Sequence, residues 1–227
     1  MLIISHRGYP AAHVPENTYE AFENAVALGV DGIETDVRMS ADGKLILFHN
    51  RLAPNGSVIA SLTHSDLSAL VEYDVPILEV ALGKWDKVLW NLEIKTPAVL
   101  EATIAVIRRL SRPQRYLITS FWHPVVEQAS RCLEVNCGIL VAHRPLDPVL
   151  PSLGWRPEHR RITTIVWDYE VLDTHLLEQT AAQGMCNFVY GAETLHEHQR
   201  CIDLKIDGII TDHPEFLVQT HTKRNNY

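Results

Sequence analysis

Eight short runs of apolar and β-branched residues recur along the chain, with helix-like stretches between most of them. The runs are residues 2–5, 32–37, 89–94, 116–121, 136–142, 162–167, 186–190 and 207–211. Strands that alternate with helices pair in parallel through right-handed crossovers. Eight such units in 227 residues predict an α/β fold, the (β/α)8 TIM barrel. An open doubly wound sheet is the alternative, but no glycine-rich dinucleotide fingerprint supports it.

The helical stretch over residues 17–28 carries the clearest end signals. Asn17 is the predicted N-cap, Glu20 stands at the capping-box position, and Gly29 follows as the stop. The same periodicity predicts helices over residues 98–110 and 172–184.

The domain organisation follows from the one place where the alternation breaks. After the second run, residues 41–50 predict a turn and an added strand, and residues 50–75 predict a short insertion. Because composition does not shift elsewhere, we expect a single barrel domain over residues 1–220 and a polar tail over 221–227.

The bulk composition excludes some partners. A net charge of −8 argues against a nucleic-acid partner, and an anionic substrate would need local positive contacts. No stretch approaches the roughly 20 apolar residues of a membrane span, and the N-terminus lacks the charged region of a signal peptide. The four cysteines show no zinc spacing, so we expect small buried thiols in a reducing compartment. These features predict a cytoplasmic protein without stable membrane insertion.

Polar side chains stand at the ends of the first three runs and of the added strand, where a barrel enzyme places its active site. The acidic pair and the Glu-x-Lys pair each have i, i+2 spacing, which puts both side chains on one face of a strand. The residues are His6 and Arg7, Glu34 and Asp36, His49, and Glu93 and Lys95.

Three carboxylates on neighbouring strands indicate a cation site. Glu34, Asp36 and Glu93 would repel one another unless a cation lay between them. Ligation by oxygen alone favours Mg²⁺ or Ca²⁺ over zinc. The alternatives are a solvated edge strand for Glu34 and Asp36, and a simple salt bridge between Lys95 and Glu93.

The remaining polar residues indicate that this site also binds a phosphate group. Arg7 and Lys95 beside a cation form a pocket for a phosphate group. His6 and His49 are then an acid and a base for cleaving a P–O bond. The pattern therefore predicts a metal-assisted phosphoryl enzyme on a barrel.

The segments HRG, PENT, GIETDV, LILFHN, NLEIK and GIITDHPE resemble the glycerophosphodiester phosphodiesterase family from residue 4 to about 217. The resemblance implies a (β/α)8 barrel that hydrolyses small-molecule glycerophosphodiesters to glycerol 3-phosphate and an alcohol. It also implies site roles: His6 and His49 as acid and base, Glu34, Asp36 and Glu93 as ligands of a divalent cation, Arg7 and Lys95 as phosphate ligands, Glu16 as a loop brace and Asn17 as the helix cap.

The chain departs from the family pattern in three places. Asn50 follows the second histidine where the family usually has Asp, so we expect altered metal affinity or an altered pKa of His49. Tyr190 stands where many members have a tryptophan stretch that walls the glycerol site, with a core tyrosine as the alternative. Phe121 either lines the pocket or packs in the core. The short insertion predicts a more open site.

Two other functions remain open from the sequence. One is release of the head group from lysophospholipids by the same chemistry. The other is a non-catalytic barrel that binds a glycerophosphate ligand, supported by Asn50 and opposed by the His6 and His49 pair. The sequence leaves the leaving alcohol, the metal, the assignment of acid and base, and the oligomeric state undetermined.

Overall fold

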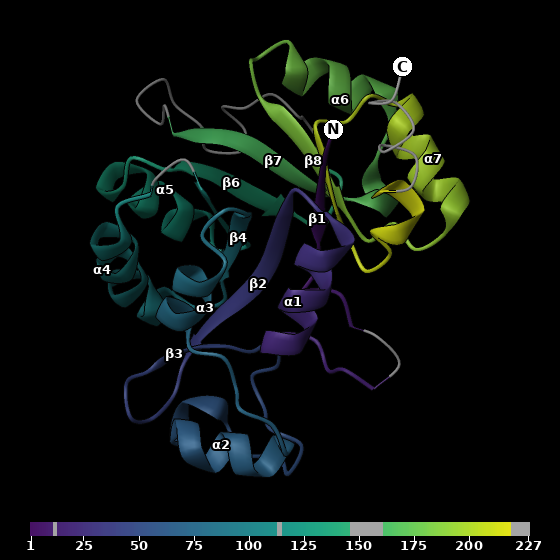
Figure 1. The fold of residues 1–227 in the computed structure, drawn as a ribbon. Helices are drawn as coiled ribbons and strands as arrows, with labels where there is room; N and C mark the ends of the chain where they lie inside the picture. The colour runs from purple at the N-terminus through teal and green to yellow at the C-terminus, as the bar shows by residue number, and fades with distance from the viewer. Residues whose placement is uncertain (11–12, 113–114, 146–160, 219–227) are drawn as a thin grey trace.

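A closed barrel forms the centre of the molecule (Figure 1). The computed structural model describes residues 1–10, 13–112, 115–145 and 161–218. Within these ranges, eight parallel strands join in a ring because β1 pairs with both β2 and β9. The predicted barrel is thus confirmed, and the open sheet is wrong. The strands are β1 (Leu2–Ser5), β2 (Gly32–Met39), β4 (Leu89–Ile94), β5 (Tyr116–Ser120), β6 (Asn136–Val141), β7 (Ile162–Asp168), β8 (Cys186–Tyr190) and β9 (Gly208–Thr211).

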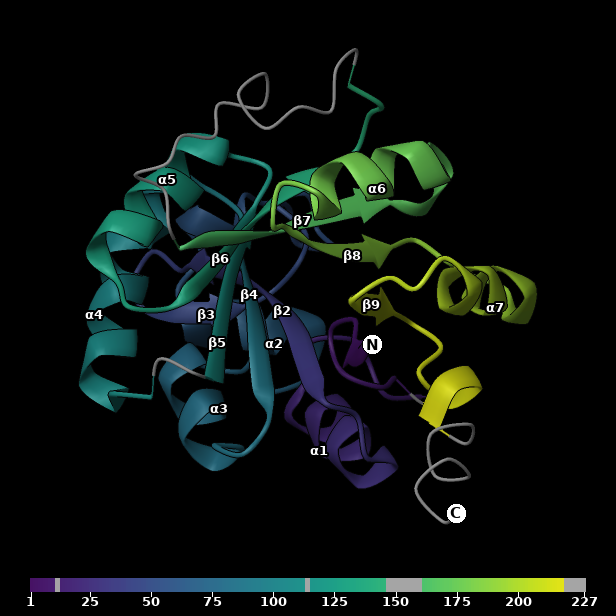
Figure 2. The ribbon, with the colours of Figure 1, turned by 90° about the horizontal axis from the view of Figure 1, so that it is seen from above.

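Helices surround the barrel, as the view from above shows (Figure 2). Buried apolar side chains fill the layer between strands and helices. A second, smaller cluster comes from six different strands and includes Ile4, Leu140 and Ile210. The outer helices are α1 (Tyr19–Leu28), α3 (Leu78–Lys84), α4 (Leu100–Leu110), α5 (His123–Cys132), α6 (Thr174–Ala181) and α7 (Leu195–Asp203), with 3₁₀ turns at Pro97–Val99 and Tyr169–Val171.

The start of α1 corrects one expectation. Thr18, not Asn17, is the N-cap, and its hydroxyl accepts a hydrogen bond from the backbone N–H of Ala21. Asn17 instead has a left-handed backbone with φ of 54° and turns its amide toward β2. Both residue types cap helices well, so local propensity could not choose between them. The predicted stop is confirmed, because Gly29 ends α1 in the left-handed conformation.

The insertion packs as a small unit beside the barrel (Figure 1). The added strand β3 (Leu45–Leu47), antiparallel to β2, precedes it, and the insertion then forms a 3₁₀ turn (Ile59–Ser61) and α2 (His64–Val71). Its own apolar cluster runs from Ile46 to Val75 and includes Leu67. The added strand places His49 near Asp36 on β2, because the backbone N–H of Phe48 donates to the Asp36 carbonyl. The domain boundaries remain a prediction, and the tail at 221–227 lies outside the described residues.

Two further expectations concern the surface and the thiols. No helix among the described residues is long and apolar enough to cross a membrane. All four cysteines are free; Cys137 and Cys201 are buried, but Cys132 and Cys186 are exposed. The expectation of four buried thiols is therefore wrong for these two, which stand at the end of α5 and the start of β8.

Candidate active site

Three carboxylates meet at the carboxyl ends of β2 and β4. In the parallel pairing Asp36 lies opposite Glu93. Glu34 precedes Asp36 by two residues and therefore lies on the same face of β2. A ligand oxygen from each of the three lies within 4.8 Å of the other two. The three carboxylates therefore form a cluster, because the register between β2 and β4 aligns the Glu-x-Asp and Glu-x-Lys motifs.

Asp36 is the buried centre of this cluster, with no exposed surface. The Arg7 Nε lies 3.2 Å from its Oδ2, and the Lys95 Nζ lies 3.1 Å from its Oδ1. The Asn17 amide donates a third contact to Oδ2 at 2.9 Å. Burial opposes ionisation, but Lys95 and Arg7 outweigh it and hold the pKa of Asp36 below its usual range.

The negative charges of Glu34 and Glu93 are less well neutralised by nearby cationic side chains than that of Asp36. Burial and the neighbouring charge of Asp36 raise the pKa of Glu34 to about 8. Burial also raises the pKa of Glu93, although Lys95 opposes this from 2.7 Å. The described side chains therefore leave the acidic cluster short of positive charge.

The first loop owes its shape to a close approach to α1. Gly8 has φ of 83°, and a Cβ there would lie 2.8 Å from the backbone of Ala21, so only glycine fits. Arg7 also has a left-handed backbone, with φ of 55°. Its guanidinium pairs with both carboxylate oxygens of Glu16, at 3.0 and 2.8 Å, and its backbone N–H donates to Glu34. Glu16 braces this loop through that pair.

The His6 side chain contacts Asp212, which lies 206 positions later in the chain. Its Nδ1 lies 2.8 Å from the Asp212 Oδ1, directly after β9, and its Nε2 lies 3.9 Å from Glu34. Burial alone would lower the pKa of His6, but the Asp212 hydrogen bond and the charge of Glu34 raise it above its ordinary value. This histidine therefore has one engaged nitrogen and one nitrogen facing the carboxylates.

His49 has a different environment. Arg38, two residues beyond Asp36 on β2, donates two hydrogen bonds to the His49 carbonyl, at 2.9 and 2.6 Å. The His49 Nδ1 lies 3.3 Å from the Asn50 Oδ1. Burial lowers the pKa of His49, and the charges of Arg7 and Lys95 add to this effect, while Asp36 opposes it. The two histidines thus shift in opposite directions.

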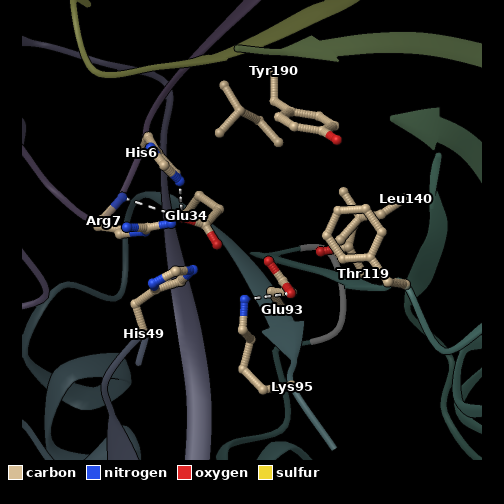
Figure 3. A pocket seen from close by; sticks show the side chains of 11 residues that line it. His6, Arg7, Glu34, His49, Glu93, Lys95, Thr119, Leu140 and Tyr190 are labelled. Carbon is tan, nitrogen blue, oxygen red and sulfur yellow. Dashed lines mark hydrogen bonds and ion pairs between the residues drawn. The ribbon is translucent and has the colours of Figure 1, made fainter. Parts of the chain in front are cut away.

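A pocket of about 230 Å³ opens beside these groups (Figure 3). One side is polar, with both histidines, and the other is formed by apolar and aromatic side chains. Phe121 and Tyr190 meet edge to face at 6.2 Å on the apolar side. The lining residues are His6, Arg7, Glu34, His49, Glu93, Lys95, Thr119, Phe121, Leu140, Tyr190 and Ile210.

The structure brings together the residues predicted to catalyse, to bind phosphate or to hold a cation. Asp36 is fully buried and does not line the pocket, whereas the other predicted site residues do. Glu16, Asn17 and Asn50 do not line it. Phe121 is 46% exposed, so core packing is wrong for it, whereas Tyr190 both lines the pocket and packs against the interior apolar cluster.

The sequence reading missed Asp212 and Arg38. Asp212 follows the last apolar run, and Arg38 continues the i, i+2 series of the second run. Either position is a signal that could have identified them.

The donor set fits a hard divalent cation. All three candidate ligands are carboxylate oxygens, the type that Mg²⁺ and Ca²⁺ prefer. Burial raises the pKa of Glu34, and a cation at this site would counteract that effect by favouring the ionised carboxylate.

Comparison with known proteins decides the family. The profile of the glycerophosphoryl diester phosphodiesterase family matches residues 6–216, nearly the whole chain. The chain belongs to this family. Membership makes the protein a hydrolase and confirms the resemblance stated from its motifs.

Relatives of the glycerophosphoryl diester phosphodiesterase family match along almost their full lengths. A glycerophosphodiester phosphodiesterase from Caldanaerobacter subterraneus subsp. tengcongensis is 29% identical, with 96% of each chain covered. A solved structure of a glycerophosphodiester phosphodiesterase from Thermotoga maritima is 25% identical with a TM-score of 0.82, covering 96% of this chain and 97% of that one.

A further structural neighbour carries a ligand. A phosphodiesterase from Oleispira antarctica, 22% identical with a TM-score of 0.82, was solved in complex with the product sn-glycerol-3-phosphate; 98% of this chain and 97% of that chain are covered. At this identity the likeness shows the shared barrel.

Proposed function

We propose that the protein hydrolyses glycerophosphodiesters to glycerol 3-phosphate and an alcohol, using His6 and His49 beside a divalent cation, Mg²⁺ or Ca²⁺. The observation that carries the proposal is one pocket lined by two histidines, two cationic side chains and two members of the three-carboxylate cluster. Family membership supports the substrate class, and the neighbour from Oleispira antarctica holds the expected product.

Each group has a role that its contacts support. Glu34, Asp36 and Glu93 hold the cation, which when bound supplies charge neutralisation at the phosphate. Arg7 presents a planar guanidinium and Lys95 a point charge to the phosphate oxygens. Phe121 and Tyr190 form the apolar wall that contacts the organic part of the substrate.

The two histidines move the protons. Breaking the ester needs a base for the attacking oxygen and an acid for the departing alkoxide, each typically worth about 10²–10⁴-fold. His6 exchanges its proton at Nε2, because Nδ1 is engaged by Asp212. The attacking oxygen is water or the free glycerol hydroxyl next to the phosphate; the second route passes through a cyclic phosphate.

The test is product analysis by phosphorus NMR. Purified protein is incubated with glycerophosphocholine, glycerophosphoethanolamine or a lysophospholipid, each with Mg²⁺, with Ca²⁺ or with chelator. Glycerol 3-phosphate is expected from the first two substrates, only with a cation. His6→Ala and His49→Ala should each lose most turnover, whereas the exposed His175→Ala should not. Near wild-type rates in both site variants, or full activity after exhaustive chelation, would refute the mechanism.

The pocket also favours a specific second candidate. Its apolar side contains Leu140 and Ile210, and Phe121 extends it into solvent. A lysophospholipid could place its acyl chain there while the same groups release its head group. Lysophosphatidate as the dominant product would select this second function.

A further inference from the structure

A second hollow adjoins the active site on the far side of His49. Its volume is about 310 Å³, and it lies where the insertion faces the first loop. His49 lines both this hollow and the active-site pocket. A substrate whose phosphate sits beside His49 can therefore extend in two directions, one into each space.

The lining of this hollow combines acidic and aromatic side chains with two amides and three apolar residues, Pro54, Leu70 and Val71. Carboxylates come from Glu16 and Glu72 and aromatic rings from Phe48 and Tyr73, and no described Lys or Arg lines it. Glu16 already pairs with Arg7. Glu72 is exposed, and no described residue forms a hydrogen bond or ion pair with its carboxylate. Its charge is thus available to a ligand in the hollow.

The backbone fixes both residues at the edge of the hollow. Glu72 ends α2 in the left-handed conformation, with φ of 61°. Tyr73 packs partly against the apolar cluster of the insertion. Burial raises the pKa of Tyr73 to about 12, so its ring stays neutral, and a neutral aromatic ring attracts cations over its face.

We propose that this hollow is the leaving-alcohol subsite and that Glu72 and Tyr73 select amino alcohols with a cationic head, such as choline or ethanolamine. The inference rests on the proposed function and adds the head-group class. A carboxylate beside an aromatic ring is the combination that attracts a quaternary ammonium. In the pocket on the other side of His49 the carboxylates belong to the candidate cation cluster, so its apolar wall takes the uncharged glycerol part.

The experiment compares kcat/KM for three substrates at low ionic strength. Glycerophosphocholine and glycerophosphoethanolamine carry a cationic head, and glycerophosphoglycerol a neutral one. Glu72→Gln and Tyr73→Leu should lower kcat/KM for the cationic pair about 3- to 10-fold and leave the neutral substrate nearly unchanged. Asp74→Asn is the matched control, since Asp74 belongs to the same loop, is largely exposed and does not line the hollow. High salt should weaken the wild-type preference.

Three outcomes would overturn the subsite. They are an equal fall for all three substrates, an unchanged ratio in Glu72→Gln, and an effect of the same size in Asp74→Asn. A binding arm separates this inference from the proposed function: glycerophosphocholine is titrated calorimetrically into chelator-treated protein. Weaker binding to Glu72→Gln than to Asp74→Asn supports the subsite even without turnover, and equal affinities refute it. Absence of any hydrolysis by wild type would refute only the proposed function.

Discussion

Replacing Glu34 with glutamine should make the cation-free protein more stable at alkaline pH while abolishing its response to metal. The carboxyl is almost fully buried next to Asp36, and its pKa rises from the ordinary 4.5 to about 8. Between these values the folded protein holds a proton that the unfolded chain has released. Stability of the cation-free protein must therefore fall as pH rises through this window.

The magnitude follows from the size of the window. Each pH unit between the two pKa values is worth about 1.36 kcal/mol, so the full loss is on the order of 5 kcal/mol. Glutamine carries no titrating proton and escapes this loss. Its carbonyl can still accept the hydrogen bond from the Arg7 backbone N–H, so the local contact survives. In a domain of this size each kcal/mol shifts Tm by roughly 2–4 °C.

The assay is urea denaturation in chelator at about pH 5 and about pH 8.5. Wild type should lose stability between the two, whereas Glu34→Gln should lose much less and exceed wild type at the higher pH. Added Ca²⁺ or Mg²⁺ should stabilise wild type and scarcely affect the variant. The exposed Glu101→Gln is the control and should behave as wild type. The reasoning is refuted if wild type and Glu34→Gln show the same dependence on pH.

Three other outcomes are expected. Arg7→Lys keeps its charge but loses the planar fork, so kcat/KM should fall about 10-fold or more, and wild-type kinetics would make Arg7 peripheral. Asp212→Asn removes the charge beside His6, so kcat should fall with little change in KM and the pH-rate profile should shift; an unaltered profile would contradict the contact. Burial lowers the pKa of His198, so the free energy of unfolding should fall as pH drops below 6.5. In urea denaturation at several pH values, the free energy of unfolding of His198→Gln should depend less on pH than that of wild type.

The barrel was predictable because each strand is a short apolar run between helical stretches. All eight runs became strands of the ring. The acidic cluster was also predictable, since the i, i+2 spacing and parallel register leave Glu34, Asp36 and Glu93 little freedom. In these elements local pattern and tertiary structure agree.

The remainder depends on contacts that no local pattern contains. Asn17 is not the helix cap because its side-chain amide forms hydrogen bonds with Thr35 and Asp36 on β2. Leu140 and Ile210 could not be assigned to the pocket, because their runs are apolar on both faces and periodicity does not tell inside from outside. Asp212 reaches His6 only once the ring has closed.

Because pairing of β1 with β9 closes the barrel, the order in which the chain is synthesised affects when the active site can be complete. His6 leaves the ribosome 206 positions before its partner Asp212. β1 also obtains one of its two neighbours only when β9 is added. A chain truncated before Asp212 would contain the three carboxylates of β2 and β4 but lack the residue that orients His6. We therefore expect a chain that ends before β9 to lack turnover, because β1 is missing one neighbouring strand and His6 is missing Asp212.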